Sequence, residues 1–194
     1  MKIAPGGPMS VEAFLLWEER QESRWEFDGM APVAWTGDTA EHSAIQRNVL
    51  VAVGGRPRGK RCQVFTADLK IAVAGSIRYP DAFVVCSQVP RGTRVMTEPV
   101  VVFEVLSPTT ASTDIGVKNQ EYRDTPSVQR YVMLSQDDQR ATVFAREGDD
   151  WVGRIVMGDA VLEMPEIGVE VPLAELYEGV SFVGFGGGEV GDVR

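Results

Sequence analysis

The spacing of apolar and polar residues predicts two helices in the first third of the chain. The first covers residues 11–21, directly after Ser10, whose hydroxyl suits a helix N-cap. The second covers residues 39–53, where apolar residues recur every three or four positions. Gly54 and Gly55 follow it, and glycine commonly ends a helix.

Most of the remaining chain has the pattern of β-strands. Residues 25–28 and 31–35 are expected to pair as a hairpin around Gly29. The apolar runs 82–86 and 100–103 are continuous, which is typical of central strands covered on both faces. Further strands are expected at 62–65, 68–73, 130–134, 141–145 and 151–157, with a loop at 88–99.

Two further helices complete the expected fold. A third helix opens at Ser112 or Thr113 and ends near Arg123, and a short closing helix covers 172–177 with Pro172 as its first residue. With no internal repeat and no long linker, we expect one domain over residues 10–183, a disordered segment 1–9 and a flexible Gly-rich tail 184–194. The fold class is α+β, a mixed β-sheet flanked by helices.

Composition narrows the class of protein. The chain has 194 residues, 44% of them hydrophobic, which suits one domain with a substantial core. No apolar run approaches the roughly 20 residues that span a bilayer, and the N-terminus lacks a signal-peptide pattern, so a cytoplasmic protein is expected. Cys62 and Cys86 lie in apolar stretches and are expected to be reduced, buried thiols. Neither has metal-finger spacing, and His42 is the single histidine, so a zinc site is not expected.

The formal net charge of −9 argues against a strong, nonspecific grip on nucleic acid, which relies on Lys and Arg. A small basic face can nevertheless occur on an acidic protein. One basic cluster could contact phosphates, and its residues are Arg56, Arg58, Lys60 and Arg61. The alternative for this cluster is a solvated loop, because it is interspersed with glycine and proline.

Two carboxylates interrupt the apolar strands. Asp81 precedes the run 82–86, and Glu104 lies inside the run 100–106. A charge in a buried strand is costly unless it is paired, hydrogen-bonded or bound to a metal. Two such acids on neighbouring strands repel each other unless a cation lies between them, and carboxylate oxygens favour Mg²⁺ or Mn²⁺. Taken singly, Asp81 could instead cap a turn and Glu104 could pair with an arginine.

The helix after the Glu104 strand carries three more polar residues at helical spacing. Asp114, Lys118 and Tyr122 are four residues apart and share one face, which could lie over the end of that strand. The alternative is a solvated Asp–Lys pair beside a half-buried tyrosine, and spacing alone favours that alternative because such pairs are common.

Three groups of residues together form a larger pattern: Tyr79-Pro80-Asp81, then Phe103-Glu104-Val105-Leu106-Ser107-Pro108-Thr109-Thr110, then Asp114 with Lys118 and Tyr122. This pattern resembles the Uma-type restriction endonuclease family of the PD-(D/E)XK nuclease superfamily. The stretches 10–14, 25–29 and 41–42 are similar to the family as well, so the resemblance covers about residues 9–182. The Glu-Val-Leu-Ser-Pro-Thr-Thr stretch is its most specific part.

The resemblance implies a restriction-endonuclease-like fold that hydrolyses DNA phosphodiester bonds. Asp81 and Glu104, with the Val105 carbonyl, would hold Mg²⁺ or Mn²⁺. The superfamily's lysine is missing, because Leu106 occupies the position two after Glu104. Lys118 is the expected substitute, since its long stem can reach the same point from the helix.

Glu26 could add a carboxylate at the edge of this site, and Asp114 and Tyr122 are possible accessory residues. His42 could contribute too, although a lone helical histidine is more often structural. A homodimer is expected, because cutting both strands of DNA usually needs two sites. Two alternatives stay open: a catalytically weak or inactive nuclease fold that binds nucleic acid or a protein partner, and a metal-dependent hydrolase with another substrate.

Overall fold

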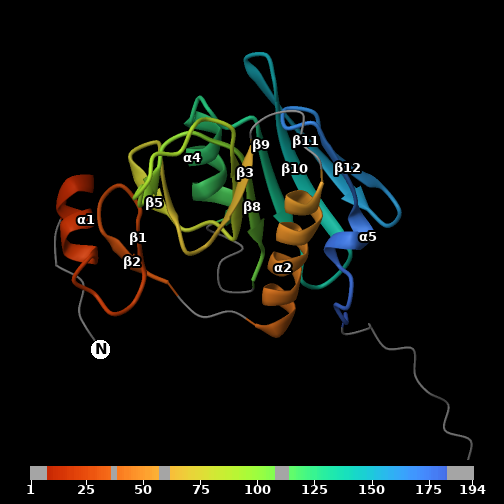
Figure 1. The fold of residues 1–194 in the computed structure, drawn as a ribbon, viewed down its shortest axis with the longest axis horizontal. Coiled ribbons are helices and arrows are strands. Elements are labelled where there is room, and N and C mark those ends of the chain that lie inside the picture. The colour runs from red at the N-terminus through yellow and green to blue at the C-terminus, as the bar shows by residue number, and fades with distance from the viewer. Residues whose placement is uncertain (1–7, 36–38, 57–61, 108–113, 183–194) are drawn as a thin grey trace, which may run out of the picture.

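The computed structural model describes residues 8–35, 39–56, 62–107 and 114–182, which form two mixed β-sheets with helices packed against them (Figure 1). The expected α+β class, a mixed sheet flanked by helices in one domain, is confirmed. Of the expected segments 1–9 and 184–194, only Pro8 and Met9 are described. The amide of Met9 donates a hydrogen bond to the carbonyl of Met30 (3.1 Å).

The larger sheet has six strands in the order β11-β10-β9-β8-β6-β3. Their bounds are β3 (Gln63–Thr66), β6 (Ala82–Val85), β8 (Pro99–Val105), β9 (Arg130–Leu134), β10 (Arg140–Glu147) and β11 (Asp150–Met157). β8 and β9 run parallel, whereas the other neighbouring pairs are antiparallel. All of β6 and nearly all of β8 are buried, as the continuous apolar runs predicted for central strands.

The smaller sheet has five strands in the order β2-β1-β5-β4-β7. Their bounds are β1 (Trp25–Phe27), β2 (Pro32–Ala34), β4 (Lys70–Val73), β5 (Ser76–Arg78) and β7 (Val95–Met96). β1 and β2 form the expected hairpin, but β5 and β7 were not predicted from the sequence. β5 follows a tight turn in which Ala74 and Gly75 adopt positive φ angles of 44° and 83°. This turn folds β5 back onto β4, and β5 carries Arg78.

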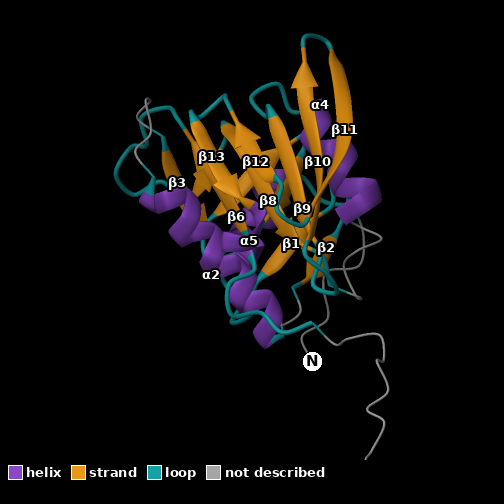
Figure 2. Cartoon of the chain, turned by 90° about the vertical axis from the view of Figure 1, so that its right-hand side faces the viewer, coloured by secondary structure: helices purple, strands orange, loops and turns teal. Residues whose placement is uncertain are grey.

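The helices cover different faces of these sheets. α2 (Ala40–Gly55) lies against one face of the six-stranded sheet, beside α5 (Leu173–Leu176), as Figure 2 shows. The π-helix η1 (Asp114–Lys118) continues into α4 (Asn119–Asp124), which contacts β9 and β4. α1 (Val11–Glu18) packs on the β1–β2 hairpin. The expected third helix is therefore π-helical in its first turn, and its expected opening residues, Ser112 and Thr113, lie outside the described residues.

Alternate side chains of β8 enter two separate cores. Val101 and Phe103 pack with Ile45 and Val49 of α2. Val102 packs on the other side, in a core that also contains Tyr122 of α4 and side chains of β4. Because side chains of a strand alternate between faces, Glu104 belongs to the same face as Val102, toward α4. A third, smaller core joins α1 to the β1–β2 hairpin.

The chain between the six-stranded sheet and its C-terminal helix forms a hairpin that was not predicted. β12 (Val161–Met164) pairs antiparallel with β13 (Val169–Pro172). Its alternating burial places Leu162, Met164, Val169 and Val171 in the core. Pro172, the expected first helical residue, is the N-cap of α5, so the helix begins one position later than expected, at Leu173.

The expectation of reduced thiols at Cys62 and Cys86 is wrong, because the structure joins them in a disulfide. The physical reason is strand register. Gln63 of β3 pairs with Val85 of β6, so the next residue outward on each strand is a cysteine facing the other. In the described part of the chain, no helix is long and apolar enough to cross a membrane.

Candidate active site

Asp81 and Glu104 come together at one end of the β6–β8 pair. Ala82 pairs with Phe103, so Asp81 immediately before β6 stands opposite Glu104 in antiparallel register. Both residues are more than nine-tenths buried, with exposures of 7% and 4%. Continuing this register places the two acids at neighbouring positions of adjacent strands, where like charges disfavour each other.

Glu104 is held by two side chains from the helix that follows its strand. The hydroxyl of Tyr122 donates to Oε1 of Glu104 (2.8 Å), and the ammonium of Lys118 donates to the same oxygen (3.1 Å). Tyr122 is fully buried and Lys118 is 6% exposed. Burial raises the pKa of Tyr122 well above its usual value, and the charge of Glu104 adds to this, so the phenol stays a hydrogen-bond donor.

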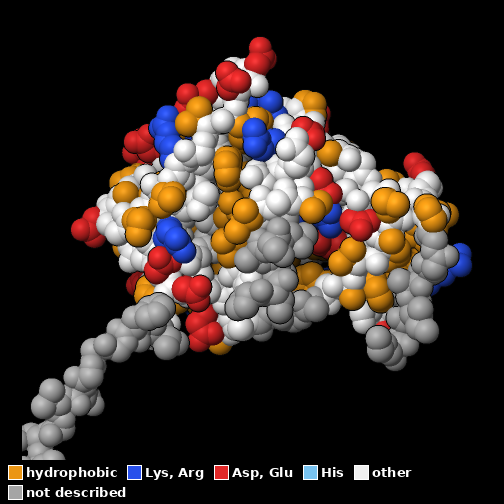
Figure 3. Space-filling model, turned by 180° about the vertical axis from the view of Figure 1, so that it is seen from behind, with side chains coloured by type: hydrophobic (Ala, Val, Ile, Leu, Met, Phe, Trp, Pro, Cys, Tyr) orange, Lys and Arg blue, Asp and Glu red, His pale blue; other side chains and the backbone are white. Residues whose placement is uncertain are grey.

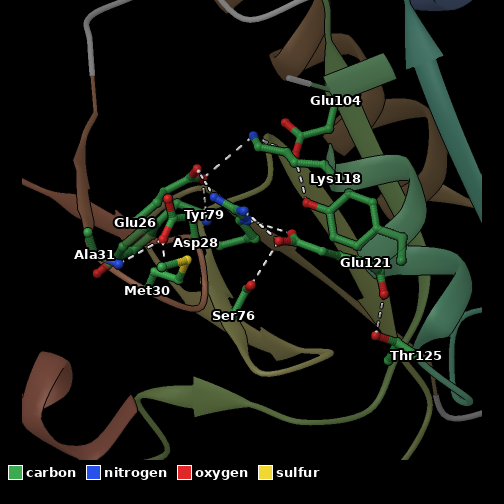
Figure 4. A network of polar contacts seen from close by, with 12 residues as sticks. Glu26, Asp28, Met30, Ala31, Ser76, Tyr79, Glu104, Lys118, Glu121 and Thr125 are labelled. Atoms are coloured by element: carbon green, nitrogen blue, oxygen red, sulfur yellow. Dashed lines mark hydrogen bonds and ion pairs between the residues drawn. The ribbon is translucent and has the colours of Figure 1, made fainter. Parts of the chain in front are cut away.

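Lys118 also reaches Glu26, which comes from the other sheet. Its Nζ lies 3.6 Å from Oε1 of Glu26, and Figure 4 shows the lysine between the two glutamates. The backbone amide of Tyr79 donates to Oε1 of Glu26 (2.9 Å), and Nη1 of Arg78 donates to Oε2 (3.2 Å). Lys118 thus links β8 of one sheet to β1 of the other.

Arg78 is the most buried charged side chain of this network, with 1% exposure. Its guanidinium donates two hydrogen bonds to Glu121 of α4, of 2.7 and 2.6 Å, while Ser76 donates a third to the same carboxylate (2.8 Å). Burial by itself lowers the pKa of Arg78. The hydrogen bonds that Arg78 donates to Glu121 and the charge of Glu26 outweigh burial, so the pKa is raised and the arginine remains charged.

Asp81 has a separate set of partners on the α2 side. Its Oδ2 accepts a hydrogen bond from the amide of Val105 (2.6 Å) and lies 3.2 Å from Nε2 of His42. The side-chain amide of Gln46 donates to the Asp81 carbonyl (2.9 Å). His42 and Gln46 are one turn apart on α2, so the first two turns of this helix fix the position of Asp81.

A neighbouring buried network stands beside this site. The ammonium of Lys70 on β4 donates to Glu18 at the end of α1, and the hydroxyl of Tyr79 donates to the other oxygen of Glu18 (2.9 Å). Burial raises the pKa of Tyr79, and the hydrogen bond to Glu18 raises it further. The backbone of Tyr79 contacts Glu26, so this network supports the site through β5.

Most of the site residues that were predicted from the sequence lie in one region. Asp81, Glu104, Lys118, Glu26, His42 and Tyr122 converge, and Val105 contributes its amide to Asp81. Asp114 opens η1, but its side chain lies outside the described part. Sequence reasoning missed Arg78, Glu121 and Gln46. The only available signal was a helical spacing, Glu121 falling three residues after Lys118.

Of the predicted basic cluster, only Arg56 belongs to the described residues, and it lies away from this site. Arg56 ends α2, about 21 Å along the helix axis from His42 at 1.5 Å per residue. Its guanidinium donates two 2.9 Å hydrogen bonds to Glu175 and one to the Ala52 carbonyl. Arg58, Lys60 and Arg61 lie outside the described residues. Contact of this cluster with phosphates stays a prediction.

The charge balance of the site favours a bound cation. Four carboxylates, those of Glu26, Asp81, Glu104 and Glu121, meet two permanent cations, Arg78 and Lys118, and one histidine. With neutral His42, about two negative charges remain in a region that is mostly buried, and such an excess is costly without a counter-ion.

The donor set fits a hard divalent metal. The described residues contain no group of three or more His, Cys, Asp and Glu side chains arranged to hold an ion. Two carboxylates and a backbone carbonyl would therefore be the protein's contribution, and Mg²⁺ is commonly held by one or two carboxylates together with water and phosphate oxygens. Oδ1 of Asp81 receives no hydrogen bond from the described residues, so it is available for such a role.

Comparison with known proteins gives the family. The model of the Uma2 family, described as "Putative restriction endonuclease", matches residues 11–174, which is most of the chain. The chain belongs to the Uma2 family. This Uma2 chain is 32% identical over 184 residues to the uncharacterized protein slr1290 of Synechocystis sp., covering 92% of this chain and 96% of that protein. It is 26% identical over 166 residues to a second Synechocystis protein, sll1609, covering 82% and 93%.

A solved structure supports the fold of this Uma2 chain. The crystal structure of a "putative nuclease belonging to DUF820" from Anabaena variabilis is similar with a TM-score of 0.70 at 19% identity. The match covers 88% of this chain and 98% of that one. The family and the fold are therefore those of restriction-endonuclease-like nucleases, as the sequence motifs indicated.

Proposed function

We propose that this Uma2 chain is a metal-dependent endonuclease that hydrolyses DNA phosphodiester bonds at the site built around Asp81 and Glu104. The observation that carries the proposal is the convergence of these two buried acids with the ammonium of Lys118, 3.1 Å from Glu104. Two carboxylates can hold a divalent metal, and a neighbouring lysine can stabilise the charge that develops during phosphodiester hydrolysis.

Asp81, Glu104 and the Val105 carbonyl would hold Mg²⁺ or Mn²⁺. Such an ion lowers the pKa of a water molecule and offsets charge on the phosphate. The protein's own residues keep the two acids ready for it. The Val105 amide and His42 orient Asp81, and Tyr122 orients Glu104. Because these partners are themselves buried, the acids keep one geometry and need little rearrangement at the moment of reaction.

Lys118 would supply the positive charge that the strand lysine supplies in the wider superfamily. Its ammonium is shared between Glu104 and Glu26, so it stays beside the acid pair without being tied to a single partner. From this position it can stabilise the attacking hydroxide or the charge that develops on the phosphate. Glu26, fixed by Arg78 and the Tyr79 amide, would hold the lysine at that place.

A second candidate is a nuclease fold that binds nucleic acid without efficient cleavage. The observation in its favour is Leu106, which occupies the usual lysine position and is half-buried against the α4-side core. The excess of carboxylates over permanent cations in this buried network favours the active enzyme, because a bound divalent metal would offset charges that are costly when buried.

The test is cleavage of supercoiled plasmid DNA with Mg²⁺ or Mn²⁺, by the wild type and by Glu104→Gln, which keeps size but removes the charge. We expect metal-dependent nicking by the wild type and none by the variant. The matched control is Glu163→Gln on the exposed side of β12, which should nick at the wild-type rate. Equal nicking by wild type and Glu104→Gln would place the chemistry elsewhere, and a wild type that binds DNA without nicking it would favour the second candidate.

A further inference from the structure

A cleft lies beside Gln46, whose side chain contacts the backbone of Asp81. It has a volume of about 420 Å³, within the range of small-molecule and nucleotide sites. One wall is formed by one side of α2 and its N-cap, and its residues are Thr39, Ser43, Gln46 and Leu50. The other walls are Trp35 after β2, Arg24 before β1, and the end of β3, where Thr66 is followed by Ala67 and Asp68.

We propose that this cleft binds one unpaired nucleobase of a nucleic-acid strand, next to the phosphate that the proposed active site would cut. The proposal rests on the proposed nuclease function for its substrate class. It adds a base-binding subsite, with Trp35 as the stacking surface and α2 as the polar wall.

The aromatic element of the cleft is Trp35. Its side chain is 37% exposed, and the guanidinium of Arg24 lies over its ring, 5.5 Å from the centroid. Arg24 is itself held by the Ala67 carbonyl (3.2 Å) and by Asp68. Tryptophan is thus fixed on one side by a planar cation, and a flat aromatic ring at the edge of a cleft is the surface on which bases stack.

The polar wall matches the edge of a base. Ser43 is exposed, and the hydroxyl of Thr39 both caps α2 and donates to Gln136. Gln46 is half-buried and has donor and acceptor groups. Hydroxyl and amide groups beside an aromatic surface can hydrogen-bond the edges of an unstacked base.

Two structural links join the cleft to Asp81. Gln46 lines the cleft and donates its side-chain amide to the carbonyl of Asp81 (2.9 Å). Thr66 of the opposite wall pairs in register with Ala82, the residue after Asp81. A base in the cleft would therefore lie near the acid pair. Gln46 would contact both the base and the backbone of Asp81.

The charge of the surface agrees with binding through stacking. The chain has a net charge of −9, and on the back of the molecule relative to Figure 1, which Figure 3 shows, Lys and Arg side chains of the described residues are scattered without a continuous basic patch. Among the described residues that line the cleft there is a single cation, Arg24, and Asp68 balances its charge. Few phosphates can thus be neutralised, so most of the affinity must come from the base.

The experiment measures binding of a fluorescently labelled ten-nucleotide single-stranded DNA by anisotropy, with the full chain and EDTA so that no cleavage occurs. We expect Trp35→Ala to weaken binding about 5- to 150-fold, which corresponds to the roughly 1–3 kcal/mol of one stacked base. Trp35→Phe should restore most of the affinity because it restores an aromatic face. An oligonucleotide with abasic sites should bind the wild type as weakly as the normal one binds Trp35→Ala.

The matched control is Trp151→Ala. Trp151 is half-buried with an arginine over its ring, Arg146 at 4.7 Å, but it lies on β11, an edge strand that β10, β9 and β8 separate from β6. We expect no loss of binding there. Equal affinity of Trp35→Ala and wild type, greater loss in Trp151→Ala, or equal binding of normal and abasic strands would each overturn the proposal, as would absence of binding by the wild type.

Failure of this proposal can be distinguished from failure of the proposed function. If the cleft alone is wrong, Trp35→Ala binds like the wild type while metal-dependent nicking still depends on Glu104. If the nuclease function alone is wrong, Glu104→Gln leaves nicking unchanged or the wild type does not nick, while anisotropy still depends on Trp35.

Discussion

The ammonium of Lys118 lies 3.1 Å from Oε1 of Glu104, although the two residues come from different elements, a helix and a strand. The same ammonium is 3.6 Å from Glu26 of the other sheet. The ammonium of Lys118 therefore occupies the centre of the acid network. In the superfamily pattern, the lysine comes two residues after Glu104. Leu106 stands at that position and faces the same core as Lys118's helix.

Lys118→Met should lower the rate of metal-dependent DNA nicking about 10²- to 10³-fold, the usual cost of removing one group that stabilises transition-state charge. Adding Leu106→Lys to this variant should restore part of the rate, because the new ammonium would enter the same face beside Glu104. The measurement is the initial nicking rate at saturating metal. A double variant as slow as Lys118→Met would show that the helix position itself matters.

Metal binding should raise the melting temperature of the wild type. At ten times the dissociation constant the gain is about 1.4 kcal/mol, which corresponds to roughly 3–6 °C for a chain of this size. Asp81→Asn should lose this shift, and Asp159→Asn, an exposed acid in the turn after β11, should keep it. The measurement is thermal unfolding with and without Mn²⁺. A wild type that does not respond to metal would contradict the metal site.

Arg78→Met should destabilise the fold by about 3–5 kcal/mol, because Glu26 and Glu121 would stay buried without their cation. Arg94→Met is the matched control. Its ion pair with Glu19 is largely exposed, so the loss should stay below about 1 kcal/mol. Urea unfolding measures both. Combining Arg78→Met with Glu121→Gln should recover stability, and a double variant less stable than Arg78→Met would contradict this account of the cluster.

Tyr122→Phe should be less stable than the wild type at pH 8, because Glu104 loses a hydrogen bond. The folded-state pKa of Tyr122 is raised, so its contribution is fully present below the unfolded pKa near 10 and is lost as pH rises. Above about pH 10 the wild type should therefore lose about 1.4 kcal/mol per pH unit more than the variant. Urea unfolding from pH 8 to 11 should show the gap closing, and a constant gap would mean that Tyr122 ionises as easily when folded.

Reduction of the Cys62–Cys86 disulfide should lower the free energy of unfolding by about 3 kcal/mol, from a sequence separation of 24 residues. Dithiothreitol should destabilise the wild type by this amount and leave Cys62→Ala/Cys86→Ala unaffected. Thiol alkylation before and after reduction checks the bond itself. Two freely alkylated cysteines in the folded, unreduced protein would contradict the pairing.

The sequence by itself determined the class of fold and the acid pair. Short continuous apolar runs are typical of strands covered on both faces, and an acid beside or inside such a run is costly without a partner, so residues 81 and 104 stood out. Their pairing follows from adjacent antiparallel strands. The family motif added Lys118 and Glu26, which the structure brings to the same place.

Only the tertiary structure decided the rest of the network. Arg78 lies on a strand whose three residues carry no strand pattern, and it meets Glu121 from 43 residues away. The contact of His42 with Asp81, the cleft beside Gln46 and the disulfide depend in the same way on which strands become neighbours and in which register. Sequence periodicity reports which face of an element is buried. It does not report what that face will meet, because that is set by the packing of elements distant in the chain.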